Sequence, residues 1–285
     1  MTIRYLSAQV VANRLCAARQ TGWMRLAVPA LGEVVPGQFV QLTCGDDLTL
    51  PRPFSVLACD AAAGTIELFY RVVGEGTRRM AAWQPGEEHA LLGPLGRPFS
   101  QPPAGSRVLL VAGGVGLAPL DFLARSLAAR GQETVLFMGT EGELPFPLQP
   151  ESAVDALPAG IALQSLQRLG VANRLASLRE RPGFFRGLVT DLAIGYVQQL
   201  SLEERARLWL VTCGPMAMMA ALARWAATEG VPGEASLEAH MACGYGVCVG
   251  CVTGIHQAEG HRLYRRVCVD GPVFALQAVD WQQAG

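Results

Sequence analysis

Four cysteines near the C-terminus have the residue type and spacing of ligands to an iron–sulfur cluster. They follow the pattern Cys243-x4-Cys248-x2-Cys251, and Cys268 comes after sixteen further residues. The spacing of the first three is that of a plant-type [2Fe-2S] cluster, which takes its fourth thiolate from further along the chain. A glycine lies within two residues of each of these three, and glycine permits the tight backbone wrap that a cluster requires. The pattern therefore predicts a carrier of single electrons.

Two other uses of these cysteines, a structural zinc site and disulfide bonds, agree less well with the sequence. Structural zinc sites usually contain two short cysteine pairs, and this chain has one C-x2-C pair. Disulfides are typical of secreted proteins, whereas Met1–Tyr5 has no apolar signal core. The other cysteines are scattered, as reduced thiols are: Cys16, Cys44, Cys59 and Cys213. We therefore predict a cytoplasmic protein.

The composition disfavours several classes of partner. The chain has 285 residues, enough for two or three small domains, with 51% hydrophobic and 16% charged residues. Its net charge of −1 gives no electrostatic basis for binding nucleic acid or an anionic membrane. The longest apolar run, Leu208–Ala223, contains Gly214-Pro215 and is too short to cross a bilayer. We expect no nucleic-acid partner and no membrane partner.

The elements that position these cysteines fall into three predicted domains. Residues 1–100 contain short alternating segments separated by turn signals, which predicts a small antiparallel β-barrel. Residues 101–230 alternate strands with helices, which predicts a doubly wound parallel sheet of the α/β class. Residues 231–285 form the predicted cluster domain. The fold class is therefore multidomain, β and α/β.

The strongest element predictions lie at the start of the α/β domain. Arg107–Ala112 is an apolar run typical of a buried strand, and Leu117–Arg130 has helical periodicity with Gly131 as its C-cap. Between them lies Gly113-Gly114-Val115-Gly116. Glycines at such a strand–helix junction let a phosphate approach the backbone and the positive end of the helix. The third glycine of the dinucleotide fingerprint is replaced by Pro119, so a plain tight turn is the alternative interpretation.

Three other motifs have a functional interpretation beside a plain structural one, and the residues alone favour the structural one for Arg52–Ser55 and for Cys213. The arginine of Arg52-Pro53-Phe54-Ser55 is suited to a pyrophosphate and its serine to a flavin ring atom, but the segment is also typical of a surface turn. Gly74-Glu75-Gly76-Thr77 is either a phosphate-binding turn or a hairpin. Cys213 ends the predicted strand Leu208–Thr212 at the edge where α/β sheets bind ligands, or it is a small buried apolar residue.

Taken in order, the motifs identify a family resemblance over nearly the whole chain. The chain resembles the electron transfer subunits of dihydroorotate dehydrogenase B, within the ferredoxin reductase superfamily. The motifs that carry the resemblance are Arg52-Pro53-Phe54-Ser55, Gly74-x-Gly76-Thr77, Gly93-Pro94-Leu95-Gly96, Gly113-Gly114-Val115-Gly116-Leu117-Ala118-Pro119-Leu120, Thr212-Cys213-Gly214-Pro215-Met216, Met241-Ala242-Cys243-Gly244-Tyr245-Gly246 and Cys268-Val269-Asp270-Gly271-Pro272-Val273-Phe274.

The resemblance implies three cofactors and a site for each. The barrel would hold FAD, with contacts from Arg52, Pro53, Phe54, Ser55, Phe69, Tyr70, Arg71, Gly76 and Thr77. The α/β domain would bind NAD(H) at Gly113, Gly114, Val115 and Gly116, with Cys213 as the catalytic residue beside the nicotinamide–flavin contact. The cluster ligands would be Cys243, Cys248, Cys251 and Cys268.

The resemblance also implies a partner and an electron route. The partner would be an FMN-containing dihydroorotate dehydrogenase catalytic subunit, in a hetero-oligomer that serves pyrimidine biosynthesis. Electrons would pass from that subunit through [2Fe-2S] and FAD to NAD+, because a flavin exchanges single electrons with a cluster and a hydride with a nicotinamide. The chain would thus be a flavin and iron–sulfur oxidoreductase subunit.

One segment departs from the pattern of the resemblance. Residues 141–186 lack the acidic Asp-Gly segment expected where the adenosine half of the nucleotide binds. Glu141 favours a free ribose hydroxyl and hence NAD(H), whereas Arg168 is suited to the 2′-phosphate of NADP(H). Two other functions stay open from the residues: a subunit of an NAD(P)H-dependent ferredoxin or sulfur oxidoreductase, and a non-catalytic redox-sensing or zinc-binding module.

Overall fold

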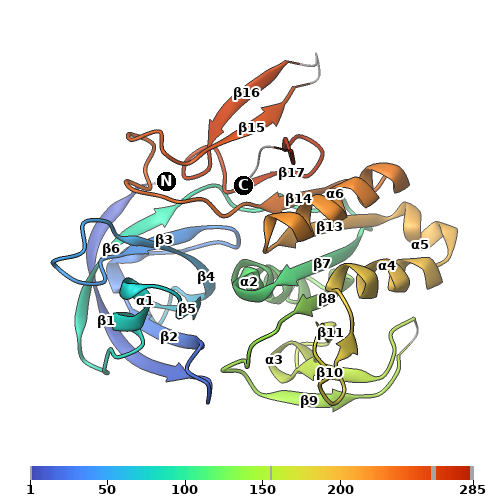
Figure 1. Cartoon of the computed structure of the whole chain (residues 1–285), viewed down its shortest axis with the longest axis horizontal. Helices are drawn as coiled ribbons and strands as arrows, with labels where there is room; N and C mark the ends of the chain where they lie inside the picture. Colours follow the sequence, from blue (N-terminus) through green and yellow to red (C-terminus); the bar gives the residue numbers. More distant parts are fainter. Residues whose placement is uncertain (1, 155, 258–260, 283–285) are drawn as a thin grey trace.

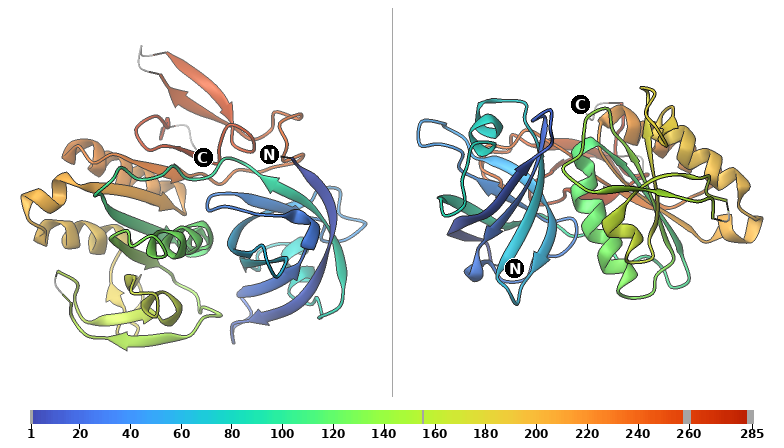
Figure 2. Two further views of the ribbon diagram at one scale, coloured as in Figure 1. Left: turned by 180° about the vertical axis from the view of Figure 1, so that it is seen from behind. Right: turned by 90° about the horizontal axis from the view of Figure 1, so that it is seen from below.

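The fold combines a closed barrel, a parallel sheet and a C-terminal hairpin (Figure 1). The structure is a computed structural model, and it describes residues 2–154, 156–257 and 261–282. The barrel and the sheet lie side by side, and the segment that carries the cysteines runs along one end of both (Figure 2). Among the described residues, no helix is both long enough and apolar enough to cross a membrane.

The N-terminal barrel is antiparallel and closed, as predicted. Its strands follow the order β1-β2-β5-β4-β3-β6, and two short helices, η1 (Pro29–Leu31) and α1 (Glu75–Met80), lie in its loops. Alternating apolar side chains, such as Met24 and Leu26, fill its interior. The strands are β1 (Arg4–Leu15), β2 (Thr21–Ala27), β3 (Phe39–Leu42), β4 (Arg52–Asp60), β5 (Thr65–Arg71) and β6 (Glu88–Leu95).

Strand β3 is buried on both faces because the cysteine segment covers its outer side. Val40 and Leu42 belong to the barrel core. Phe39 instead packs in a cluster that also contains Cys251 and Cys268. Since successive side chains of a strand point to opposite faces, Gln41 lies on the same outer face as Phe39.

The central sheet has the order β12-β11-β8-β7-β13-β14-β17, and all neighbours are parallel except β14 and β17. The predicted doubly wound architecture is confirmed, because apolar helix faces cover both sides of the sheet. The strands are β7 (Arg107–Gly113), β8 (Thr134–Gly139), β11 (Ala172–Ser177), β12 (Phe185–Arg186), β13 (Leu208–Cys213), β14 (Gly233–Ser236) and β17 (Val273–Ala275).

The helices of this domain differ in length and position. Helix α2 begins at Leu117, immediately after the 3-10 turn η2 (Gly114–Gly116), and ends at Ala128. It packs against β4 of the barrel as well as against the sheet. The remaining elements are β9 (Leu148–Glu151), β10 (Gly160–Leu163), α3 (Gln164–Gln167), α4 (Val189–Gln199), α5 (Leu202–Ala206) and α6 (Met216–Glu229).

The C-terminal segment is less separate than the predicted boundary at residue 230 implies. Helix α6 ends at Gly230 in a left-handed C-cap and leads directly into β14, which pairs with β13 in the central sheet. This β13-α6-β14 crossover continues the α/β domain past residue 230. Within the described part of this C-terminal segment, β15 (Val252–His256) and β16 (Arg262–Arg266) form a two-stranded sheet separate from the central one. They are the hairpin that projects from the molecule in Figure 1.

Candidate functional site

The four predicted cluster ligands lie in two close pairs. The backbone N–H of Cys248 donates to Cys243 Sγ at 3.4 Å, and the N–H of Cys268 donates to Cys251 Sγ at 3.4 Å. A [2Fe-2S] cluster with cysteine ligands takes two thiolates on each iron. Among the described residues, no three His, Cys, Asp or Glu side chains converge on one metal-ion position. The two pairs therefore fit a two-iron cluster.

The loop between the first three cysteines has the backbone that a cluster requires. Gly244 and Gly246 have φ values of 76° and 91°, in the left-handed region that glycine adopts without strain. Val249 also has a positive φ, 56°. Arg266, at the end of β16, donates to the carbonyl of Gly246 at 3.0 Å and so holds the loop beside Cys268.

The thiols differ in how readily they ionise. Burial opposes ionisation of Cys243, but backbone N–H groups of Cys248, Tyr245 and Val247 outweigh it and lower the pKa of Cys243 to about 6. Burial and the neighbouring thiols raise the pKa of Cys268 to about 12. Cys243 is thus ready to act as a thiolate ligand, whereas Cys268 needs the metal itself to displace its proton.

The predicted flavin contacts come from the start of β4 and the start of α1. A Cβ atom on Gly76 would lie 3.3 Å from Arg52 Cγ and Nε, so the two motifs are adjacent. Thr77 caps α1, because its hydroxyl accepts hydrogen bonds from the N–H groups of Val73 and Gly74. Gly74–Thr77 therefore begins the helix α1 rather than a hairpin, and it does so beside the Arg52 side chain.

The contacts expected from β5 divide between two faces of that strand. Phe69 packs edge-to-face on Phe146, with ring centroids 5.0 Å apart, at the seam between barrel and α/β domain. Tyr70 is buried in the barrel, where its hydroxyl donates to Asn13 Oδ1 at 2.9 Å, and burial raises the pKa of Tyr70 to about 12. Arg71 is exposed. Alternation along β5 therefore places Phe69 and Arg71 away from the barrel core and Tyr70 within it.

The remaining flavin residues line the start of β4. Pro53, Phe54 and Ser55 are each partly exposed, and the Phe54 ring lies edge-to-face on Tyr70 at 6.5 Å between centroids. Pro53 pairs with Gln41 on the adjacent antiparallel strand β3. The motif thus begins a strand that is flanked by β3 and β5.

The glycine loop after β7 meets the turn after β13. A Cβ atom on Gly116 would lie 2.2 Å from the carbonyl oxygen of Cys213, and one on Gly113 would lie 2.6 Å from Pro215 Cδ. Gly114 has a φ of 55°. The prediction of a strand–turn–helix junction here is confirmed, with Val115 in the turn and α2 beginning at Leu117. Both loops lie at the carboxyl edge of the sheet, where dinucleotides bind.

Cys213 is buried at this edge, near Ser236 at the end of β14 and Glu238 two residues later. Burial, followed by the charge of Glu238, raises the pKa of the Cys213 thiol, while a hydrogen bond from Ser236 opposes the shift. Desolvation by neighbouring atoms raises the pKa of Glu238, although the residue as a whole is exposed. Sequence reasoning missed Glu238, because its approach to Cys213 depends on the pairing of β13 with β14. No local motif marks this carboxyl.

The two residues considered for nucleotide preference, Glu141 and Arg168, lie on different elements of the α/β domain. The Glu141 carboxylate follows β8 and accepts a hydrogen bond from the Leu178 N–H at 2.8 Å, at the end of β11. Arg179 Nε lies 4.0 Å from it. Arg168 instead forms the C-cap of α3. Glu141 therefore stands at the carboxyl edge where a ribose binds, with Arg179 as the cation beside it.

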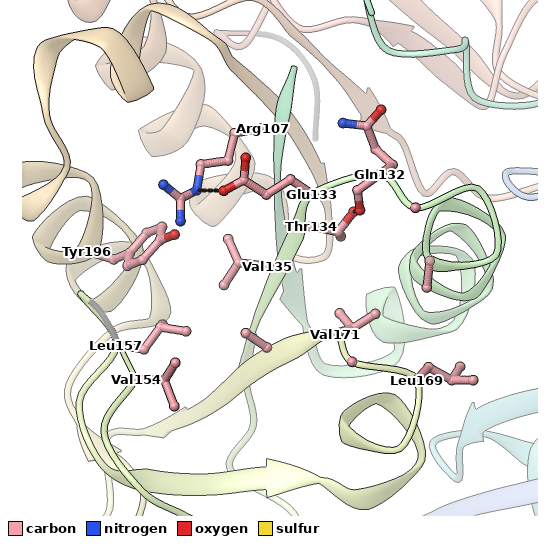
Figure 3. Close-up of a pocket in the computed structure, with 14 residues that line it drawn as sticks. Arg107, Gln132, Glu133, Thr134, Val135, Val154, Leu157, Leu169, Val171 and Tyr196 are labelled. Carbon is pink, nitrogen blue, oxygen red and sulfur yellow. Dashed lines mark hydrogen bonds and ion pairs between the residues drawn. The ribbon is translucent and has the colours of Figure 1, made fainter. Parts of the chain in front are cut away.

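A cavity of about 380 Å³ lies at the opposite edge of the sheet (Figure 3). It is lined by the first residues of three strands, among them Arg107 and Thr134. Arg107 pairs with Glu133 at 3.0 Å and faces the Tyr196 ring. Dinucleotides bind at the carboxyl ends of parallel strands, so this cavity is separate from the nucleotide edge.

Comparison with solved structures identifies the fold. The chain is similar to a structure described as NADH-dependent reduced ferredoxin-NADP oxidoreductase, with a TM-score of 0.79, 24% identity and coverage of 97% of this chain and 91% of that one. It is also similar to a ferredoxin reductase in carbazole 1,9a-dioxygenase, with a TM-score of 0.63, 20% identity and coverage of 81% and 67%. The ferredoxin reductase fold is therefore confirmed.

Comparison of sequences identifies the family. A family model described as the iron–sulfur cluster binding domain of dihydroorotate dehydrogenase B matches residues 238–280. The electron transfer subunit of dihydroorotate dehydrogenase B (NAD(+)) from Desulforamulus reducens is 33% identical over 98% of this chain and 99% of its own length. That from Shouchella clausii is 35% identical over 94% and 97%. The chain belongs to the family of dihydroorotate dehydrogenase B electron transfer subunits.

Proposed function

We propose that this chain carries electrons between an FMN-containing dihydroorotate dehydrogenase catalytic subunit and NAD+, through a [2Fe-2S] cluster and FAD, in pyrimidine biosynthesis. The observation that carries the proposal is the match to the Desulforamulus reducens subunit over 98% of the chain. The match covers all three regions that the cofactors require. The paired cysteines, the Arg52–Gly76 contact and the glycine loop supply a fitting site for each cofactor.

The residues of the chain position and shield the cofactors. Bound FAD supplies the chemistry that converts single electrons into a hydride. The glycine loop and the first turn of α2 offer backbone N–H groups to the nucleotide pyrophosphate. Cys213, 2% exposed, and the Gly214-Pro215 turn pack against the glycine loop at the carboxyl edge of the sheet, where they would exclude water from a bound nicotinamide. Glu141 accepts the ribose hydroxyl of NAD(H).

An apolar face around the cysteine loop supports a docking partner. Cys248 is exposed, so this edge of the cluster site reaches the surface. Exposed apolar side chains surround it on the loop and on the β15–β16 hairpin, and contiguous patches of this kind mark protein interfaces. The docking face comprises Tyr245, Val247, Val249, Val252 and Tyr264, which are between 44% and 71% exposed. A partner seated there would approach the cluster directly, as electron transfer from its FMN requires.

We assign the complex to the cytoplasm. The assignment rests on the family and on eight free cysteines, which a reducing compartment keeps available for metal. NAD+ as the electron acceptor fits the same compartment.

The decisive experiment is purification of the complex from its native host without oxygen. We expect a stoichiometric FMN-containing dihydroorotate dehydrogenase subunit, and a complex that reduces NAD+ with dihydroorotate. The isolated chain should oxidise NADH with dyes and should leave dihydroorotate unchanged. Dihydroorotate turnover by the isolated chain would refute the proposal. Recovery of a larger flavoprotein with additional iron–sulfur clusters would instead assign the chain to a ferredoxin or sulfur oxidoreductase.

A further inference from the structure

A buried glutamine connects the cysteine loop to the flavin-binding strands. Gln41 is 1% exposed on the outer face of β3. Its Nε2 donates to the carbonyl oxygen of Ala242 at 3.4 Å, across 201 positions of the sequence. Its Oε1 accepts no hydrogen bond from any residue that the structure describes. A polar group this deeply buried is normally satisfied, so the position of this amide calls for a functional reason.

The Gln41 amide lies directly against Gly244, the residue after the cluster ligand Cys243. A Cβ atom on Gly244 would lie 2.5 Å from Gln41 Oε1, 2.6 Å from Cδ and 2.9 Å from Nε2. The positive φ of Gly244 favours glycine, and any side chain there would displace the Gln41 amide. The amide therefore packs directly on the backbone of the cysteine loop.

The backbone of Gln41 lies beside the flavin motif. Gln41 pairs with Pro53 of β4, within Arg52–Ser55, and with Leu92 of β6 on the other side. One residue thus contacts the flavin motif through its strand pairing and the cluster loop through its amide. Electron tunnelling is favoured where closely packed atoms, rather than solvent, separate donor and acceptor.

We propose that Gln41 is a positioning residue that couples the cluster loop to the flavin-binding strands and so sets the rate of electron transfer between the two cofactors. The inference rests on the proposed function. The crossing is a one-electron step: the cluster is oxidised by one electron, the flavin is reduced by one electron, and no bond or proton changes at Gln41. Hydrogen bonds and solvent exposure near a cluster also set its potential.

The test compares Gln41→Met with Arg97→Met in the full chain purified without oxygen. Methionine keeps the packing volume against Gly244 and removes the amide. Arg97 is a matched control, because its Nε also joins the barrel to the cysteine segment, at the carbonyl of Val269 (3.3 Å), but beside Cys268 rather than beside the flavin motif. Iron and FAD content, flavin reduction by NADH and the following reduction of the cluster are each measured by rapid mixing.

In Gln41→Met we expect normal FAD content and normal flavin reduction, with cluster reduction slowed about tenfold or more. Arg97→Met should transfer electrons at the wild-type rate. Wild-type cluster reduction in Gln41→Met would overturn the inference, as would equal slowing in both variants. A wild-type chain that holds neither FAD nor iron would instead refute the proposed function.

A second variant covers the case in which Gln41→Met fails to retain the cluster. Gln41→Glu keeps the length of the side chain, loses the amide donor and adds a negative charge beside Gly244. We expect the cluster midpoint potential, measured by electron paramagnetic resonance during redox titration, to become more negative. A potential equal to that of the wild type would overturn the inference.

Discussion

The ligand cysteines are not equivalent, because each has a different exposure and a different set of hydrogen bonds. Cys248 is exposed, whereas Cys251 and Cys268 are almost fully buried in the same group of packed apolar side chains as Phe39. In the predicted ligand set, the exposed Cys248 would border the proposed docking face, and the buried Cys251 and Cys268 would hold the iron–sulfur cluster close to the barrel. Loss of the exposed ligand should leave the fold of the other domains in place.

Replacement of Cys248 by serine tests the ligand assignment. We expect Cys248→Ser to lose the visible absorbance of the iron–sulfur cluster while FAD stays bound, because the flavin residues lie on the barrel. Cys59→Ser is the matched control, since Cys59 is a partly exposed thiol on β4 outside the predicted ligand set. Absorbance spectra and iron content distinguish them, and an unchanged cluster spectrum in Cys248→Ser would show that the ligand set is wrong.

Tyr70 predicts a pH dependence at the alkaline end. Burial raises the pKa of Tyr70 to about 12 in the fold, whereas tyrosine in an unfolded chain ionises near about pH 10. The folded state thus holds the proton more tightly, so Tyr70 stabilises the fold below pH ~10 and this contribution is lost as pH rises through ~12. In Tyr70→Phe the stability should fall less steeply above pH ~10, as measured by denaturant unfolding. Tyr5→Phe, at an exposed tyrosine, should behave as the wild type.

At the level of elements, the glycine loop after β7 and the turn after β13 pack closely because no side chain separates them. Gly116 lies against the carbonyl of Cys213. Any side chain there would push η2 away from the β13 turn and displace the first turn of α2. The N–H groups that face the pyrophosphate would move with it.

Gly116→Ala should therefore weaken NADH binding. We expect KM for NADH to rise about tenfold or more in the dye-linked assay, since small displacements of binding groups are costly. FAD content should be unchanged. Gly195→Ala is the matched control: that glycine lies within helix α4, its φ is not positive, and a Cβ atom there would meet nothing within 4 Å. An unaltered KM in Gly116→Ala would place the pyrophosphate elsewhere.

We expect the ends of β8 and β11 to set nucleotide preference. The Glu141 carboxylate lies 4.0 Å from Arg179 Nε, so it should accept a ribose diol and repel a 2′-phosphate. In Glu141→Ala we expect kcat/KM to fall for NADH and to rise for NADPH, with Arg179 free to pair with the phosphate. The ratio of the two values is the readout. A ratio equal to that of the wild type would contradict this placement of the ribose.

For the molecule as a whole, the β15–β16 hairpin projects from one end, whereas the glycine loop lies at the carboxyl edge of the central sheet (Figures 1 and 2). We therefore expect the catalytic subunit and NAD+ to bind at the same time. This separation should also allow mutations that affect docking alone.

Val247→Asp should weaken docking and leave the chemistry of the isolated chain intact. Val247 is 71% exposed, and a charge at the centre of an apolar interface is costly. We expect the Kd for the catalytic subunit to rise about tenfold or more, with normal NADH oxidation by dyes. Leu202→Asp is the matched control, because Leu202 is 83% exposed on α5, in the α/β domain. Equal affinity of both variants would place the docking face elsewhere.

Short-range patterns were enough to predict the architecture and the chemical groups. The barrel, the parallel sheet and the junction at Gly113–Gly116 follow from periodicity and turn residues that lie close together in the chain. The cysteine spacing likewise identified the cluster type, because both the ligand and its glycines are local. The pairing of β14 with β13, beyond residue 230, is a long-range contact that no local pattern marks.

Long-range packing determined how those groups relate to one another. The approach of Gln41 to Gly244, the position of Glu238 beside Cys213 and the inward direction of Tyr70 each depend on contacts between separate segments. No periodicity encodes such contacts, because they arise only when strands from distant parts of the chain pair in register. The amino-acid pattern thus indicates which cofactors this chain can hold, and the folded packing determines how the residues of the predicted sites lie relative to one another.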